Sequence, residues 1–178
     1  MKDYPIAEER AREMFEEHSS YIYGVALMLT RQRVLADDIT QETFLRAFAK
    51  FDHYDDSKPL RPWLYRITVN TARNMLRKKS WKQLFTGIPA MGAEDSAEYK
   101  AMQGEDRQML WHAVSRLSLK QREVITLHYY AGLPLPETAS ALGIPLGTCK
   151  SRLHAALEKL RLYYEKEPEL QTLKEGLK

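Results

Sequence analysis

The stretch that decides the fold is Leu135–Leu160, which reads LPETASALGIPLGTCKSRLHAALEKL. It predicts a short helix that stops at Gly143, a turn in which Pro145 prevents the helix from continuing, and a second helix from about Gly147. The apolar residues of the second helix recur at i, i+4, i+7, i+8 and i+11, and are therefore expected to form one buried face. They are Cys149, Leu153, Ala156, Leu157 and Leu160.

The polar side of that second helix is the first candidate nucleic-acid contact. Its basic and hydroxyl side chains lie off the apolar face: Thr148, Lys150, Ser151, Arg152 and His154. Such side chains suit the major groove of DNA, which presents base acceptors between two rows of phosphates. The alternative is a helical hairpin whose polar side faces solvent, since short helix pairs joined by glycine are common. The turn alone leaves both interpretations open.

Composition indicates an ordinary globular protein of a reducing compartment. The 178 residues suffice for one large domain or two small ones, and a single cysteine excludes an internal disulfide framework. No apolar run approaches the length of a membrane span, and the acidic, polar N-terminus is unlike a signal peptide. We therefore predict a cytoplasmic protein with no membrane insertion.

The basic residues are unevenly distributed, although the formal net charge is only +3. The first helix is acidic, whereas no aspartate or glutamate occurs between Asp56 and Glu94. That interval contains Lys58, Arg61, Arg66, Arg73, Arg77, Lys78, Lys79 and Lys82. Such asymmetry indicates a polyanionic partner at one place on the surface.

Nearly every periodic segment is helical, and no alternating run indicates a strand. Helices are expected over residues 6–18, 20–30, 34–51, 61–79, 106–116 and 119–130, followed by the helix-turn-helix. Residues 86–104 carry four Gly or Pro residues among small and polar ones, which is typical of a linker. We predict an all-α protein of two small helical domains joined by a flexible linker. Its parts are a first domain (1–83), the linker (84–105), a helix-turn-helix domain (106–164) and a tail (165–178).

The helix expected over residues 34–51 has two distinct faces. A core stripe recurs at i, i+3, i+4 and i+7 and consists of Phe44, Ala47, Phe48 and Phe51. The opposite side carries Asp38, Gln41, Glu42, Leu45 and Ala49. Charge on an outer helix face is usually just solvated surface. An exposed leucine beside carboxylates could also dock a basic helix of a partner, although the spacing alone favours the solvated surface.

The helix expected over residues 61–79 carries an apolar side and a basic stripe. The apolar side consists of Leu64, Ile67, Thr68, Thr71 and Met75. The stripe places Arg66, Asn70, Arg73 and Arg77 at i, i+4, i+7 and i+11, with Trp63 beside it and Tyr65 close. Arginines neutralise phosphates, asparagine can bond a base edge, and an aromatic ring can stack on an unpaired base. The alternative is that Trp63 covers the core and the arginines are merely solvated.

Four segments together resemble the extracytoplasmic-function (ECF) sigma factors of bacterial RNA polymerase. They are LADDITQETFLRAF (35–48), PWLYRITVNTARNMLR (62–77), LSLKQREVI (117–125) and GIPLGTCKSRLH (143–154). The resemblance covers roughly residues 15–162, in the family's order and spacing. It implies a promoter-specificity subunit that binds core polymerase, recognises the −35 and −10 promoter elements, needs no cofactor, and in many family members is held inactive by an anti-sigma factor.

The resemblance also implies a role for each matching residue. The surface that docks on the β′ coiled coil corresponds to Asp38, Gln41, Glu42 and Leu45. The helix that melts and recognises the −10 element corresponds to Arg61, Trp63, Arg66, Asn70, Arg73, Asn74 and Arg77. The −35 contacts correspond to Arg122, Thr148, Lys150, Ser151, Arg152 and His154. The loop over residues 52–57 corresponds to the one that captures a flipped base, and a further polymerase contact is expected on the β flap.

Four positions depart from the family pattern. Asn74 stands where aspartate is frequent, and Ala155 where a basic residue is frequent. Pro134 replaces the usual Ser or Thr cap, and Thr138 replaces an aliphatic residue. A proline in the first helical turn costs little, because its missing N–H would have no partner there. We expect a slightly less stable first helix of the helix-turn-helix.

Two rival functions are less consistent with the sequence. A stand-alone helix-turn-helix regulator would be expected to dimerise and bind a palindrome. It would assign no function to the Asp38/Glu42 face or to the Trp63/Arg66 stripe. A metal-dependent hydrolase needs ligand spacing, which the five histidines lack, and no nucleophile motif or phosphate loop is present. We therefore predict that the chain is no enzyme and holds no metal.

Overall fold

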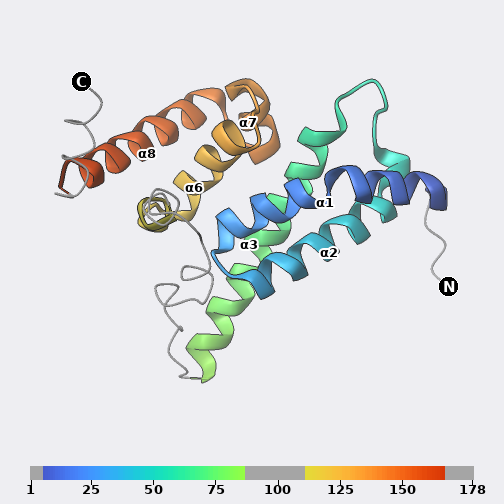
Figure 1. The fold of residues 1–178 in the computed structure, drawn as a ribbon, viewed down its shortest axis with the longest axis horizontal. Coiled ribbons are helices and arrows are strands. Elements are labelled where there is room, and N and C mark those ends of the chain that lie inside the picture. The colour runs from blue at the N-terminus through green and yellow to red at the C-terminus, as the bar shows by residue number, and fades with distance from the viewer. Residues whose placement is uncertain (1–5, 87–110, 167–178) are drawn as a thin grey trace, which may run out of the picture.

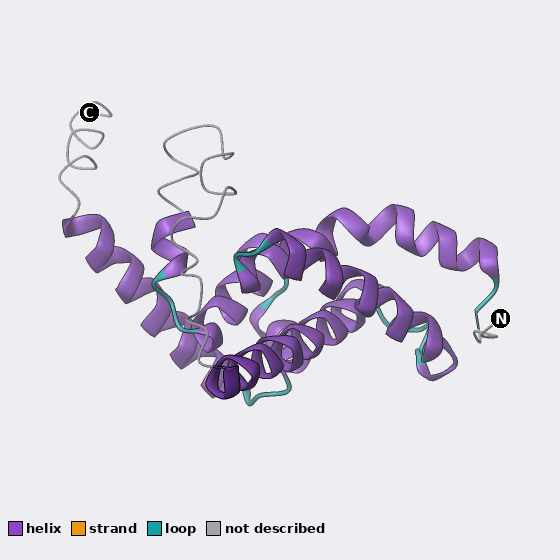
Figure 2. Cartoon of the chain, turned by 90° about the horizontal axis from the view of Figure 1, so that it is seen from below, coloured by secondary structure: helices purple, strands orange, loops and turns teal. Residues whose placement is uncertain are grey.

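The structure is a computed structural model that describes residues 6–86 and 111–166. Within these ranges every regular element is a helix, as Figure 2 shows, and the all-α prediction is confirmed. The first domain contains α1 (Glu8–Thr30), α2 (Arg33–Ala49), the 3₁₀ turn η1 (Phe51–His53) and α3 (Leu60–Thr86). The second contains a helical segment at 111–115, α6 (Leu119–Ile125), the π-helical turn η3 (Thr126–Tyr130), α7 (Leu135–Leu142) and α8 (Leu146–Lys166).

Several predicted boundaries were wrong. The two helices expected over residues 6–18 and 20–30 are one continuous helix, α1, because His18 is buried and no proline interrupts the chain. The helix expected over residues 61–79 continues as α3 to Thr86. The rest of the predicted linker and most of the predicted tail lie outside the described residues.

The three helices of the first domain pack against one another (Figure 1). The predicted core stripe of α2 is confirmed by Phe44, which is buried with its ring centroid 4.9 Å from that of Phe15 and 5.9 Å from that of Phe48. On α3, Leu64 and the hydroxyl-bearing Thr68 are fully buried, and the Thr68 hydroxyl donates to the Leu64 carbonyl at 2.9 Å. That bond satisfies the polar group that burial would otherwise leave without a partner.

In the second domain, the helix-turn-helix forms as the sequence predicts. Gly143 ends α7 with φ 66° and ψ 39°, the left-handed conformation that glycine adopts at little cost. Ser118 and Gln121 form a capping box that starts α6. Pro134 caps α7 without a side-chain bond, while the buried Thr138 hydroxyl donates to the Leu133 carbonyl at 3.2 Å. Threonine is therefore accommodated at this aliphatic position by a local hydrogen bond.

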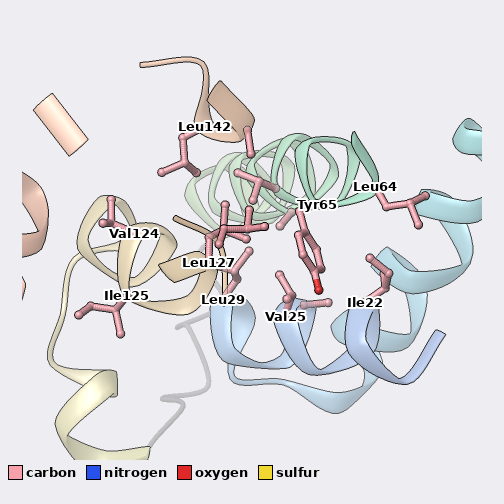
Figure 3. Packing of buried hydrophobic residues seen from close by; sticks show 14 of the residues in the cluster. Ile22, Val25, Leu29, Leu64, Tyr65, Val124, Ile125, Leu127 and Leu142 are labelled. Carbon is pink, nitrogen blue, oxygen red and sulfur yellow. The ribbon is translucent and has the colours of Figure 1, made fainter. Parts of the chain in front are cut away.

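The two domains pack directly on each other. Helix α3 contacts α7, and α1 contacts α6 and η3. Figure 3 shows the result, a single cluster of buried side chains that includes Leu29 and Tyr65 of the first domain and Leu127 and Leu142 of the second. Tyr65, which the sequence placed close to the basic stripe, belongs to this core and is only 2% exposed.

Candidate nucleic-acid interface

The basic stripe of α3 lies on the side of the helix away from its buried residues. Arg66, Asn70 and Arg77 are exposed, as predicted, and Arg77 donates to the Asn74 side-chain oxygen at 3.2 Å. Arg61, at the start of the helix, places its guanidinium carbon 5.1 Å from the centre of the Tyr21 ring. Much of this face can therefore reach a nucleic-acid backbone. Arg73 is the exception, because it is hydrogen-bonded to the second domain.

Trp63 belongs to an aromatic row at the N-terminal end of α3. The Tyr54 ring lies 5.0 Å from the Trp63 ring and 5.7 Å from the Phe51 ring, measured between centroids. Tyr54 also donates its hydroxyl proton to the Lys58 carbonyl within the same loop, while its ring contact with Trp63 joins the loop to the helix. Trp63 is half-buried: it packs against the core and leaves part of its surface exposed, so both sequence interpretations stay open.

The acidic loop before α3 is organised by Asp55. Its Oδ1 accepts hydrogen bonds from the Ser57 hydroxyl at 2.6 Å and the Ser57 amide at 3.1 Å, and its Oδ2 lies 3.0 Å from Lys58 Nζ. The Ser57 hydroxyl, then Lys58, lower the pKa of Asp55 to about 2. The Asp55 carboxylate thus shapes the loop, and much of its accepting capacity is already used.

A cavity of about 440 Å³ lies between this loop and the second domain. Trp63, Tyr54 and Arg66 line it from the first domain, and Glu137 and Ser140 of α7 line it from the second. Its lining combines aromatic rings with cationic groups, which is the chemistry that binds an unstacked base and its phosphate.

Arg73 forms a bidentate ion pair with Glu123 across the two domains. Its Nε and Nη2 donate to the two carboxylate oxygens of Glu123 at 2.6 and 2.7 Å, and its Nη1 donates to the Leu142 carbonyl at 3.3 Å. Glu123 is 1% exposed. The hydrogen bonds with Glu123 raise the pKa of Arg73.

Sequence reasoning missed Glu123, although a signal was present. Glu123 lies directly before the apolar run VITL (124–127), beside residues expected to be buried, and a buried carboxylate requires a cation. A second missed contact is Gly24 of α1, where an added Cβ would lie 1.9 Å from the Tyr130 hydroxyl oxygen of η3. Glycine inside a helix commonly marks such a close approach.

The candidate recognition face of α8 is largely open. Lys150, Ser151 and His154 are exposed, while Thr148 and Arg152 are half-buried. Opposite them, Cys149, Leu153 and Ala156 are buried as predicted. The prediction that Leu157 joins this buried face was wrong: it is 39% exposed, because the second domain is too small to cover the whole stripe.

Arg122, expected beside the recognition helix, lies instead at the interface of the two domains. Its Nε and Nη1 are buried without a hydrogen-bond partner. Burial, and then the positive charge of Arg31 in the first domain, lower its pKa to about 10. In this arrangement Arg122 cannot reach a DNA phosphate through those atoms.

The polar side of α2 forms a separate, accessible surface. Asp38 and Gln41 are exposed, and Leu45 is 47% exposed. Glu42 Oε1 lies 2.6 Å from Nε of Arg46, one turn later on the same helix. An apolar side chain flanked by carboxylates is therefore available to a basic partner.

The described residues contain no group of three or more acidic, histidine or cysteine side chains that could hold a metal ion. No helix over the described ranges has both the length and the apolar character needed to cross a membrane.

Comparison with known proteins identifies two family models along the chain. Sigma-70 region 2 matches residues 14–82, and Sigma-70, region 4 matches residues 107–160. The chain is 33% identical over 153 residues to ECF RNA polymerase sigma factor SigL of Mycobacterium tuberculosis, covering 85% of this chain and 86% of the relative. It is 29% identical over 156 residues to ECF RNA polymerase sigma factor SigM of Bacillus subtilis, covering 86% of this chain and 94% of the relative.

Solved structures share the fold. The sigma factor RpoE from Bartonella quintana, in complex with the anti-sigma factor NepR, matches 89% of this chain and 99% of its own with a TM-score of 0.77 and 24% identity. CnrH, in complex with the cytosolic domain of CnrY, matches 90% of this chain and 91% of its own with a TM-score of 0.68 and 21% identity.

Proposed function

The chain belongs to the ECF RNA polymerase sigma factors, and from this premise we propose which of its surfaces direct initiation and how. As a member of this family it is a specificity subunit of transcription initiation. The polymerase supplies the chemistry, and this chain performs no catalysis of its own. We place its work in the bacterial cytoplasm, where the polymerase transcribes.

The α3 face binds the opened strand of the −10 element. Arg61, Arg66, Arg73 and Arg77 neutralise phosphates, and Asn70 and Asn74 supply bonds to base edges. Trp63, in the aromatic row with Tyr54, stacks on an unpaired base. Each stacked base contributes roughly 1–3 kcal/mol, enough to help hold a melted strand open.

The recognition face of α8 holds the −35 element as closed duplex. The side chains assigned to it are Thr148, Lys150, Ser151, Arg152 and His154, with Arg122 on the backbone nearby. One observation carries the proposal: an exposed basic helix with an adjoining aromatic row and a helix-turn-helix with an exposed basic face occur in one chain.

The α2 surface of Asp38, Gln41, Glu42 and Leu45 docks on the β′ coiled coil, and the second domain contacts the β flap. Docking places the two DNA sites together on one promoter, so that two weak contacts act at high effective concentration. The free chain therefore binds promoter DNA weakly and the holoenzyme binds it tightly. We also propose that an anti-sigma factor regulates this chain. The RpoE structure, which shares its fold, contains the anti-sigma factor NepR, and the CnrH structure contains the cytosolic domain of CnrY.

A pair of double variants tests these assignments. Lys150→Ala with Arg152→Ala is expected to reduce promoter-dependent transcription while leaving affinity for core polymerase unchanged. Asp38→Arg with Glu42→Arg is expected to abolish polymerase binding, since it replaces two carboxylates with like charges toward a basic partner. Normal polymerase affinity of the Asp38→Arg, Glu42→Arg variant would refute the assignment of the docking surface. Normal transcription with the Lys150→Ala, Arg152→Ala variant would refute the assignment of α8 as the recognition helix.

A further inference from the structure

We propose that this chain inhibits itself: the second domain covers the part of the strand-binding face of α3 around Arg73 and Trp63, and is held there by the ion pair between Arg73 and Glu123. This inference rests on the proposed role of α3 in binding the opened strand. It adds that α6 and α7 of the same chain lie against that face in the closed state.

The Arg73–Glu123 pair excludes a phosphate from Arg73. All three guanidinium nitrogens already donate, two to the carboxylate of Glu123 and one to the Leu142 carbonyl. A phosphate binds arginine through the same planar fork that a carboxylate uses. Arg73 can therefore bind Glu123 or DNA through that fork, but not both at once.

Helix α7 also occupies the aromatic end of the face. Glu137 and Ser140 form a wall of the cavity whose other wall holds Trp63 and Arg66. A carboxylate thus lines the same cavity as the ring and the cation that the proposed function gives to a base and its phosphate. A strand of DNA crossing Trp63 toward Arg73 would run into this helix, so the domains must separate before the strand binds.

The same interface contains a group that opposes closure. Arg122 buries two guanidinium nitrogens without a partner, and Arg31 of the first domain brings a second positive charge near it. Glu123 compensates part of this charge, but burying guanidinium nitrogens without hydrogen-bond partners is still unfavourable, and separation of the domains returns Arg122 to water or to a DNA phosphate. The Arg73–Glu123 ion pair favours the closed state and the burial of Arg122 opposes it. Polymerase or DNA can therefore shift the equilibrium between the closed and the open state.

Two variants release the closed state without altering a proposed DNA contact. Glu123→Gln keeps the shape of the side chain and removes the charge that holds Arg73. Gly24→Ala places a methyl group 1.9 Å from the Tyr130 hydroxyl oxygen, so the Tyr130 side chain must leave its place against α1, and in a helix interior alanine is otherwise more favourable than glycine. Matched controls are Glu158→Gln, an exposed acid on α8, and Gly147→Ala, where an added Cβ meets nothing within 4 Å.

Opening is measured in the full-length chain by fluorescence energy transfer. Donor and acceptor dyes are attached at Lys50→Cys and Lys159→Cys, both at exposed positions in different domains, while the native Cys149 is fully buried. In the same samples, binding of a fluorescein-labelled single-stranded DNA of random sequence is measured by anisotropy. Circular dichroism checks that each variant remains folded.

We expect both release variants to lower energy transfer and to bind the single strand at least about fivefold more tightly, because a binding-competent state that was a minority becomes populated. Both controls should match the parent chain in both measurements. The gain should disappear when Arg73→Ala is added to Glu123→Gln, since the freed arginine is then missing.

Two results overturn the inference in distinguishable ways. If neither folded variant changes energy transfer or affinity, while Arg66→Ala still weakens strand binding, the self-inhibition is wrong and the strand-binding role of α3 stands. If the variants open but affinity does not rise, and Arg66→Ala also has no effect, the assignment of α3 as the strand-binding face fails together with the inference.

Discussion

Replacing Leu45 by alanine is expected to weaken docking on the β′ coiled coil by about three- to tenfold. Leu45 is 47% exposed on α2, so a partner can bury roughly half of its side chain. Full burial of leucine contributes about 1.5–3 kcal/mol, and 47% of that is roughly 0.7–1.4 kcal/mol. Each 1.4 kcal/mol corresponds to about a tenfold change in the dissociation constant.

The assay is a titration of the purified chain with a folded fragment of the coiled coil, followed by calorimetry or anisotropy. Leu162→Ala is the matched control, because Leu162 is 50% exposed and lies on α8 in the other domain. It should leave the affinity for the fragment unchanged. Thermal unfolding of both variants should remain close to that of the parent chain, since neither side chain is buried.

An unchanged affinity for Leu45→Ala would show that the α2 surface is solvated and that docking occurs elsewhere. A loss far above tenfold, with an unchanged melting temperature, would show that the partner buries much more than this one side chain. Equal losses for Leu45→Ala and Leu162→Ala would contradict the placement of docking on α2.

Three further predictions concern the first domain. Phe44→Ala should lower the free energy of unfolding by about 3–5 kcal/mol in chemical denaturation, because it empties a buried site between two other rings; a loss below 1 kcal/mol would contradict that packing. NMR titration of the Asp55 carboxyl should give a midpoint near 2, and Ser57→Ala should move it toward 3.8. Because the folded pKa is lowered, the loop gains stability from Asp55 above about pH 4 and loses it as the pH falls through 2; an unshifted midpoint would refute the loop bonds. Trp63→Ala should weaken holoenzyme binding to a promoter with a pre-melted −10 element by at least about fivefold, since one stacked base contributes roughly 1–3 kcal/mol; full affinity would remove Trp63 from the strand-binding face.

Local signals in the sequence predicted most of the second domain. Gly143, Pro145 and the apolar spacing from Cys149 to Ala156 specify the helix-turn-helix, because each acts within a few residues of its own position. The mistaken break near Ser19 arose for a different reason. Serine weakens a helix only slightly, and burial of His18 and Ile22 on the same face decides that α1 continues.

Contacts between the domains could not be derived from periodicity. Arg73 and Arg66 look equivalent along the stripe, but Arg73 is bonded to a residue 50 positions away. Glu123 and Gly24 were each locally anomalous, an acid directly before an apolar run and a glycine inside a helix. Each anomaly indicates that a partner exists, whereas only the tertiary structure shows which residue it is.

The most direct test of the central claim is reconstituted run-off transcription on a genomic DNA library, with core polymerase and the purified chain. We expect transcripts from a limited set of start sites that share −35 and −10 elements, present only when the chain is added. The Lys150→Ala, Arg152→Ala double variant should lose these transcripts. If core polymerase alone produced the same start sites in the same yield, the chain would not be the subunit that selects them.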